Sequence, residues 1–259
     1  MGRGMTLPDL FGFLTGLLAG GLGALLGIGG GVIVVPFLVL FLKLPIRVAI
    51  GTSFLAVLAT SLSSASSYLQ TDLCDVKAAL SLEFATVAGA ITGAYGAGLV
   101  SPRFLEGAFS LLLFYVSGRM LLKREKKGED QAPEDSSSGK RTLFAQTASF
   151  AAGIVSGSLG VGGGIIKVPM LHYILRFPMR KAVATSSFMI GITVAASTVI
   201  FTMRGDVAPL VAGPLIAGIF VGAKVGARLM PRVKDEVLKK AFALLILYFG
   251  FRFALMVLR

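Results

Sequence analysis

Two charged residues lie inside long apolar segments, where a charge is costly and marks a functional position by default. Lys167 follows a glycine-rich element, and Glu83 is the one carboxylate well inside an apolar run. A buried ammonium group can hold an anion. A buried carboxylate can carry a proton, gate a pathway, or pair with Lys167 and lower the cost of burying both. The alternatives are that Lys167 extends to the membrane surface and that Glu83 only fixes helix packing.

The glycine-rich element that precedes Lys167 occurs twice. Gly27-Ile-Gly-Gly-Gly31-Val-Ile-Val-Val-Pro36 returns as Gly160-Val-Gly-Gly-Gly164-Ile-Ile-Lys-Val-Pro169, a shift of 133 residues (160 − 27). Glycine lets a helix unwind, and the amides that start the next half-helix form an anion site. Close packing of helices is the alternative. The candidate substrate-binding residues here are Gly27, Gly29, Gly30, Gly31 and Pro36, and Gly160, Gly162, Gly163, Gly164, Lys167 and Pro169.

Two hydroxyl pairs and one histidine complete the set of candidates. Thr52-Ser53 and Thr185-Ser186 follow the two elements at matched positions. Their hydroxyls can donate to an anion or cap the start of the next helix. His172 is the single histidine; together with Glu83 it is a candidate for coupling or gating, and a hydrogen bond at a helix end is its alternative. No metal site is expected.

The composition indicates which elements must hold these residues. The chain has 259 residues, of which 55% are hydrophobic and 15% charged, and its mean hydropathy is +0.84. Soluble domains carry about 25% charged residues, so we expect an all-α, polytopic membrane protein. Its +12 net charge fits basic loops facing the cytoplasm and anionic lipid, not nucleic acid. The single Cys74 excludes an internal disulfide, and the first apolar run is expected to be a permanent span.

The apolar runs predict two homologous repeats, at residues 8–122 and 143–258, joined by a charged linker at 123–142. Within each repeat the first run is too long for a single helix across a core of about 30 Å. The glycines divide it after Leu26 or Leu159 into a full-length half and a shorter half. Whether the shorter half spans the membrane or re-enters it is left open.

The distribution of Lys and Arg favours an inverted topology. With the linker in the cytoplasm, four crossings per repeat would place most basic residues of the second repeat outside, against the positive-inside rule. An odd number of crossings returns those residues to the cytoplasm. Arg47 and Arg180 are then expected on opposite faces of the membrane.

The repeated motif resembles a known family. The duplicated Gly-x-Gly-Gly-Gly-x-x-x-x-Pro, followed by Pro-x-Arg-x-Ala and Thr-Ser at Pro45–Ser53 and Pro178–Ser186, is similar to the TauE/SafE family of sulfite and organosulfonate anion permeases. The resemblance covers nearly the whole chain. It implies a membrane transporter of sulfite, sulfonates or related sulfur-containing or carboxylate anions.

The expected function is secondary anion transport by alternating access around the two broken helices. A passive anion channel and a carrier of small carboxylates are the alternatives. An enzyme is not expected, since the chain has one His and no His-Glu-x-x-His or Walker element. No cofactor is expected. The expected partners are a small anion, the bilayer of the cell membrane, a coupling ion (proton or sodium) and, as an open option, a second copy of the chain.

Overall fold

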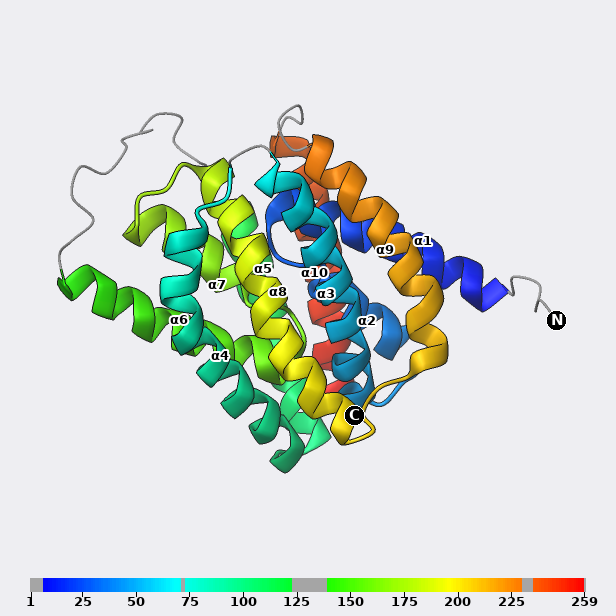
Figure 1. The fold of residues 1–259 in the computed structure, drawn as a ribbon. Coiled ribbons are helices and arrows are strands. Elements are labelled where there is room, and N and C mark those ends of the chain that lie inside the picture. Colours follow the sequence, from blue (N-terminus) through cyan, green and yellow to red (C-terminus); the bar gives the residue numbers. More distant parts are fainter. Residues whose placement is uncertain (1–6, 71–72, 123–138, 230–234, 259) are drawn as a thin grey trace.

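The computed structural model describes residues 7–70, 73–122, 139–229 and 235–258. Within these ranges every regular element is a helix, which confirms the all-α prediction (Figure 1). The elements are α1 (Leu7–Leu26), α2 (Gly31–Leu40), α3 (Ile46–Leu69), α4 (Val76–Leu99), α5 (Pro102–Leu122), α6 (Gly139–Leu159), α7 (Gly164–Pro169), the π-helix η1 (Met170–Ile174), α8 (Met179–Met203), α9 (Pro209–Leu229) and α10 (Asp235–Val257).

The helix boundaries repeat with the same shift as the sequence motif. Helices α2 and α7 begin at Gly31 and Gly164, and α3 and α8 begin at Ile46 and Met179, a shift of 133 residues in both cases (164 − 31, 179 − 46). The long helices that precede the glycines, α1 and α6, end at Leu26 and Leu159, as expected. Helix α6 begins at Gly139, inside the range 123–142 assigned to the linker, and the linker boundaries stay a prediction. Residues 123–138 lie outside the described ranges.

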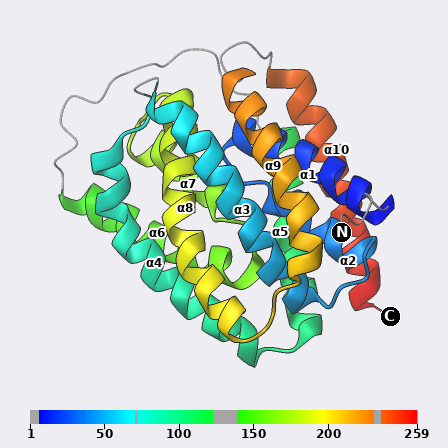
Figure 2. The same ribbon diagram turned by 45° about the vertical axis from the view of Figure 1, so that its right-hand side comes forward.

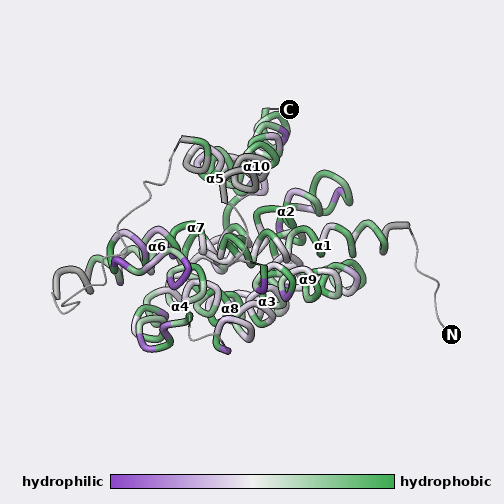
Figure 3. Tube along the Cα trace, turned by 90° about the horizontal axis from the view of Figure 1, so that it is seen from above, coloured by the Kyte–Doolittle hydropathy of each residue, from purple (hydrophilic) through white to green (hydrophobic). Residues whose placement is uncertain are grey.

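The helices form three layers that mix the two halves of the chain. Viewed from above, α6, α7, α2 and α1 form a middle layer, with α4, α8, α3 and α9 on one side and α5 and α10 on the other (Figure 3). Helix α1 packs on α9, α4 on α6, α3 on α8 and α5 on α10. Each of these pairs joins one helix from each half, so neither half forms a separate bundle.

Glycines on α4 and α9 allow the closest of these contacts. A Cβ atom at Gly89 or Gly93 of α4 would lie 2.1 or 2.3 Å from a backbone oxygen of α6, and one at Gly222 of α9 would lie 2.1 Å from the oxygen of Leu17 on α1. The small residues spaced four apart therefore serve close helix packing.

Corresponding helices of the two halves run antiparallel. On the α5–α10 interface, the Ser110 hydroxyl donates to the Gly250 carbonyl at 3.0 Å and the Ser117 hydroxyl donates to the Ala243 carbonyl at 2.9 Å. The residue number rises along one helix as it falls along the other. Helices α3 and α8 follow the same antiparallel course (Figure 2).

Four of the described helices, α3, α4, α8 and α9, are long and apolar enough to cross a membrane, as expected for a multi-pass membrane protein. Basic residues lie at both ends of α4. Arg47 donates to the Val100 carbonyl at its C-terminal end at 2.6 Å, and Lys181 pairs with Asp75 at its N-terminal end at 2.7 Å. At 1.5 Å per residue these ends are about 36 Å apart.

Candidate functional site

Both glycine elements break a helix by the same backbone conformation. Three glycines in each break have positive φ angles: Gly27, Gly29 and Gly30 at 66°, 81° and 77°, and Gly160, Gly162 and Gly163 at 74°, 80° and 74°. Residues with a side chain rarely adopt this conformation. This requirement accounts for the spacing Gly-x-Gly-Gly in both copies.

The fourth glycine of each element brings the two breaks into contact. A Cβ atom at Gly31 would lie 2.2 Å from the Gly160 carbonyl oxygen, and a Cβ atom at Gly164 would lie 2.2 Å from the Gly27 carbonyl oxygen. Only a hydrogen atom fits between these backbones. The first turns of α2 and α7 therefore begin side by side, each against the break of the other half.

The starts of the two half-helices meet at this contact, and in each the third amide already donates to the N-cap carbonyl (Ile33 to Gly30 at 3.0 Å, Ile166 to Gly163 at 3.1 Å). The first amides of a helix have no acceptor within it, and they carry the positive end of its dipole. The N-caps of α2 and α7 are Gly30 and Gly163, and neither start is capped by a side chain. Two positive helix ends at one place favour an anion.

Two apolar side chains that are not among the predicted site residues cover the breaks. A Cβ atom at Gly29 would lie 2.9 Å from Val57 and 3.4 Å from Ile190, and one at Gly162 would lie 2.9 Å from each. Val57 on α3 and Ile190 on α8 are buried, and they too are 133 residues apart (190 − 57). This spacing, equal to the repeat shift, is the sequence signal that could have identified the two residues.

The predicted hydroxyl pairs hold the breaks in place. Ser53 donates to the Gly160 carbonyl at 2.9 Å, and Ser186 donates to the Gly27 carbonyl at 3.3 Å. Each serine thus binds the break of the other half. Direct contact between these hydroxyls and an anion stays a prediction.

The two threonines accept hydrogen bonds from residues that immediately precede helices of the other half. Thr52 on α3 accepts a hydrogen bond from the Ala208 amide at the start of α9 at 2.9 Å. Thr185 on α8 accepts from the Asp75 amide at the start of α4 at 3.0 Å. Capping the start of the next helix was one of the two predicted roles. The start of α4 is capped instead by Asp75, whose side chain accepts from the Ala78 amide at 3.0 Å.

Lys167 and Glu83 form the expected ion pair. Lys167 Nζ lies 3.4 Å from Glu83 Oε2 and 2.5 Å from Thr193 Oγ1, and the Thr193 hydroxyl also contacts Glu83 Oε1. Lys167 is 0% exposed and Glu83 4% exposed, so the alternative that Lys167 extends to the membrane surface is wrong. Thr193 was not predicted, because threonines recur through the apolar runs. Only the folded structure shows that this one contacts Lys167 and Glu83.

His172 and the two prolines lie in the second halves of the broken helices. His172 Nδ1 lies 2.8 Å from the Phe177 carbonyl oxygen; a carbonyl only accepts, so Nδ1 donates. This agrees with the alternative of a hydrogen bond at a helix end. Helix α2 continues past Pro36, whereas α7 ends at Pro169 and changes into the π-helix η1.

The second break has room for a hydroxyl that the first lacks. Ser156 Oγ is buried without a hydrogen-bond partner, and a Cβ atom at Gly163 would lie 3.6 Å from it. The corresponding residue of the first half is Gly23, where a Cβ atom would lie 2.4 Å from the Gly30 nitrogen. This replacement of Gly23 by Ser156 was visible in the aligned repeats.

An unpartnered hydroxyl beside the start of α7 can donate to a bound anion, so Ser156→Ala is expected to weaken anion binding. A hydrogen bond to a charged group is worth about 1.5–3 kcal/mol, which corresponds to a tenfold or greater rise in Kd. The unfolding temperature without anion is expected to stay close to that of the wild type. Anion titrations followed by thermal shift measure both, with the exposed Ser81→Ala as control. An unchanged Kd would contradict the assignment.

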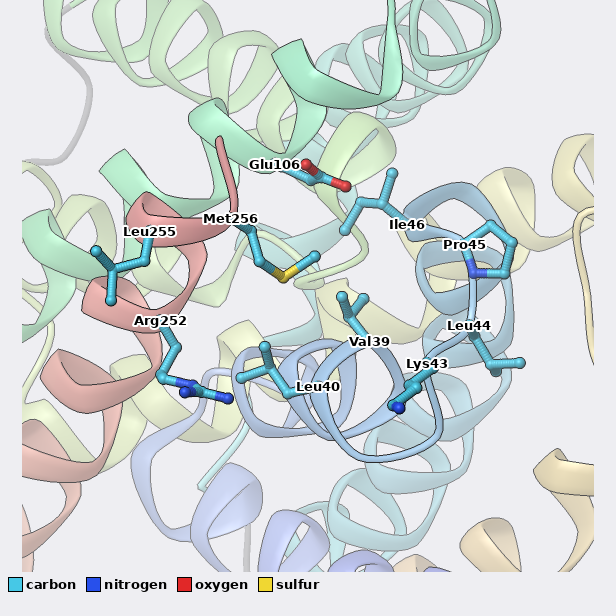
Figure 4. Close-up of a pocket in the computed structure, with 10 residues that line it drawn as sticks. All are labelled: Val39, Leu40, Lys43, Leu44, Pro45, Ile46, Glu106, Arg252, Leu255 and Met256. Carbon is cyan, nitrogen blue, oxygen red and sulfur yellow. The ribbon is translucent and has the colours of Figure 1, made fainter. Parts of the chain in front are cut away.

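A separate pocket of about 470 Å³ lies between the end of α2 and the α5–α10 pair (Figure 4). Its polar groups come from Lys43, Glu106 and Arg252. None of the predicted site residues lines it. The lining residues are Val39, Leu40, Lys43, Leu44, Pro45, Ile46, Glu106, Arg252, Leu255 and Met256.

A multi-pass helical protein with two broken helices meeting in its core has the architecture of a membrane transporter. The sequence profile of the family "Sulfite exporter TauE/SafE" matches residues 12–253. The chain belongs to this family.

Curated relatives carry the same description. "Probable membrane transporter protein YunE" of Bacillus subtilis is 29% identical over 91% of this chain and 93% of its own length. "Probable membrane transporter protein YdhB" of the same organism is 28% identical over 90% and 93%, and a "Probable membrane transporter protein" of Haemophilus influenzae is 27% identical over 90% and 93%. No solved structure matches the chain. The family and these relatives are described as transporters, not as enzymes.

Proposed function

We propose that the chain is a secondary transporter of small anions that works by alternating access, with sulfite and organosulfonates as the leading substrates. The observation that carries this proposal is the contact between the starts of α2 and α7, each against the opposite glycine break. Half-helix starts at a break are anion sites in transporters. Lys167 beside the second break adds the cation that an anion requires.

The packing limits how such a transporter can move. Because α1 packs on α9 and α4 on α6, one half of the chain cannot rock as a body against the other. Val57 and Ile190 cover the breaks, which favours a transporter over an open channel with the same site. We propose that the contact between these two side chains and the breaks is the one that changes during transport.

The test is anion flux into liposomes that contain the purified chain, with sulfite, ethanesulfonate, thiosulfate and small carboxylates as probes. Saturable uptake and exchange of internal for external anion are expected for at least one sulfur-containing probe. Single-channel currents without exchange would show that the chain is a channel and not a transporter. Uptake of carboxylates alone would remove sulfur anions as the substrate class.

We further propose that the two halves are inverted in the membrane, with the linker in the cytoplasm. The antiparallel course of α5 and α10 supports this. Lys43 and Arg176 are exposed, 133 residues apart (176 − 43), and share a positive φ of 51° and 55°. Cysteines at these two positions, in a chain with Cys74→Ser, are expected to react with an impermeant reagent from opposite sides of the membrane. Labelling from one side would contradict the inverted arrangement.

A further inference from the structure

We propose that each transported monovalent anion moves together with one proton, which Glu83 takes up when Lys167 leaves it to bind the anion. This inference rests on the proposed anion transport and names its coupling ion. In this exchange no covalent bond changes except that between the proton and a Glu83 carboxylate oxygen. The proton comes from water on one side of the membrane and returns to water on the other.

The ion pair is close enough to the breaks to respond to an anion there. The Lys167 amide donates to the Gly163 carbonyl at 3.0 Å, so Lys167 lies in the first turn after the second break. On α8, Thr193 lies three residues after Ile190, whose side chain lies against Gly162 and Gly164. One turn of helix is about 5.4 Å, so the Lys167–Glu83–Thr193 cluster lies about one turn from the contact of the two half-helices.

In this structure Lys167 is held by protein groups. Two of its three ammonium hydrogens are directed at Glu83 and Thr193, and the side chain is 0% exposed. An anion at the second break therefore competes with Glu83 for Lys167. A buried carboxylate that loses its cation is destabilised by several kcal/mol, unless it is protonated.

The charge balance gives the stoichiometry. The Lys167–Glu83 pair carries no net charge, and after the exchange a Lys167–anion pair beside a neutral Glu83 carries none either. A monovalent anion that entered without a proton would leave one net negative charge in the apolar core. One proton per monovalent anion keeps the core neutral.

Other charged groups lie too far away to replace Lys167 as the partner of Glu83. Glu83 is on α4, which packs against α6 and α8, and Lys167 is its one charged contact among the described residues. Asp75 and Lys181 pair with each other eight residues earlier along α4, about 12 Å away. The remaining charged side chains with described surroundings on α4, α6, α7 and α8 are at helix ends: Lys77, Arg180 and Arg204.

The experiment uses liposomes that contain the full chain and an internal pH-sensitive dye. The probe is ethanesulfonate, a monovalent anion that stays ionised and cannot itself carry the proton. An inward ethanesulfonate gradient is expected to acidify the interior with about one proton per anion. Ethanesulfonate uptake without acidification would overturn the inference while leaving anion transport intact. No flux of any anion would instead overturn the proposed function.

The variant Glu83→Gln imitates the protonated state. It is expected to retain anion exchange while proton movement per anion falls at least tenfold. Glu106→Gln, a carboxylate change on α5 beside the separate pocket, is the matched control and is expected to keep full coupling. Proton movement that persists in Glu83→Gln would overturn the assignment.

A measurement on the wild type keeps the test independent of the folding of that variant. Where anion binding adds one proton, Kd falls up to tenfold for each unit that the pH falls, over the range in which Glu83 is ionised before binding and protonated after it. The Kd of ethanesulfonate between pH 5 and 8 is expected to follow this slope over part of the range. A Kd independent of pH would overturn the inference.

Discussion

Gly31→Ala is expected to force the two glycine breaks apart and to lower anion flux at least tenfold. The new Cβ atom would lie 2.2 Å from the Gly160 carbonyl oxygen and 3.0 Å from Val57. The nearest atom is backbone, which cannot rotate away as a side chain can. Overpacking of this kind typically costs about 1–3 kcal/mol. Gly164→Ala is expected to behave alike, because its Cβ atom would meet the Gly27 carbonyl oxygen at the same distance.

The control for these two variants is a helical glycine at which an added Cβ atom meets no neighbour. A Cβ atom at Gly96 on α4 would have no atom within 4 Å, so Gly96→Ala should stabilise its helix by about 0.5–1 kcal/mol and leave flux unchanged. Flux and unfolding in detergent are measured for all three variants. Wild-type behaviour of Gly31→Ala and Gly164→Ala would show that the breaks do not touch as described.

Lys167→Met is expected to destabilise the protein by about 3–5 kcal/mol, since it leaves the Glu83 carboxylate buried without its cation. Methionine retains most of the apolar length of the side chain, so lost packing contributes little. Adding Glu83→Gln should restore much of that stability, because no charge then remains. The double variant should nevertheless lack anion transport. A double-mutant cycle on unfolding in detergent measures the coupling, and additive effects would contradict a direct pair.

The chain offers an exposed ion pair as a control for this cycle. Lys181 and Asp75 are 2.7 Å apart, with side chains 38% and 28% exposed. Water screens such a pair, and exposed pairs contribute at most about 1 kcal/mol. Lys181→Met is therefore expected to change stability far less than Lys167→Met. An equal effect of the two substitutions would indicate that burial does not set the importance of the Lys167 pair.

The positions of the breaks could be predicted from sequence because their cause is local. Three positive φ angles require glycine at fixed spacing, and the same spacing at Gly27 and Gly160 marked both breaks. The ends of α1 at Leu26 and of α6 at Leu159 follow from this. The Lys167–Glu83 pair was predictable for a second reason, since an isolated buried charge needs a partner and few candidates exist.

The covering and supporting residues could not be predicted, because they depend on which helices meet. Val57, Ile190 and Thr193 are ordinary residues of helices α3 and α8, and only the packing of these helices against the breaks gives them a role. The hydrogen bond of Thr52 illustrates the same limit. The sequence left anion contact and a helix cap open for its hydroxyl, but its partner, the Ala208 amide, belongs to the other half of the chain.

The packing of α1 on α9 also has a consequence for biogenesis. Helix α1 is synthesised before α9, yet its Gly16 and Gly20 pack against α9, nearly two hundred residues later in the chain. The α4–α6 pair can form much earlier during synthesis. Helix α1 must therefore wait in the lipid, or be shielded by an insertase, until α9 has been synthesised. A chain cut in the linker should assemble only when both fragments are made in the same cell.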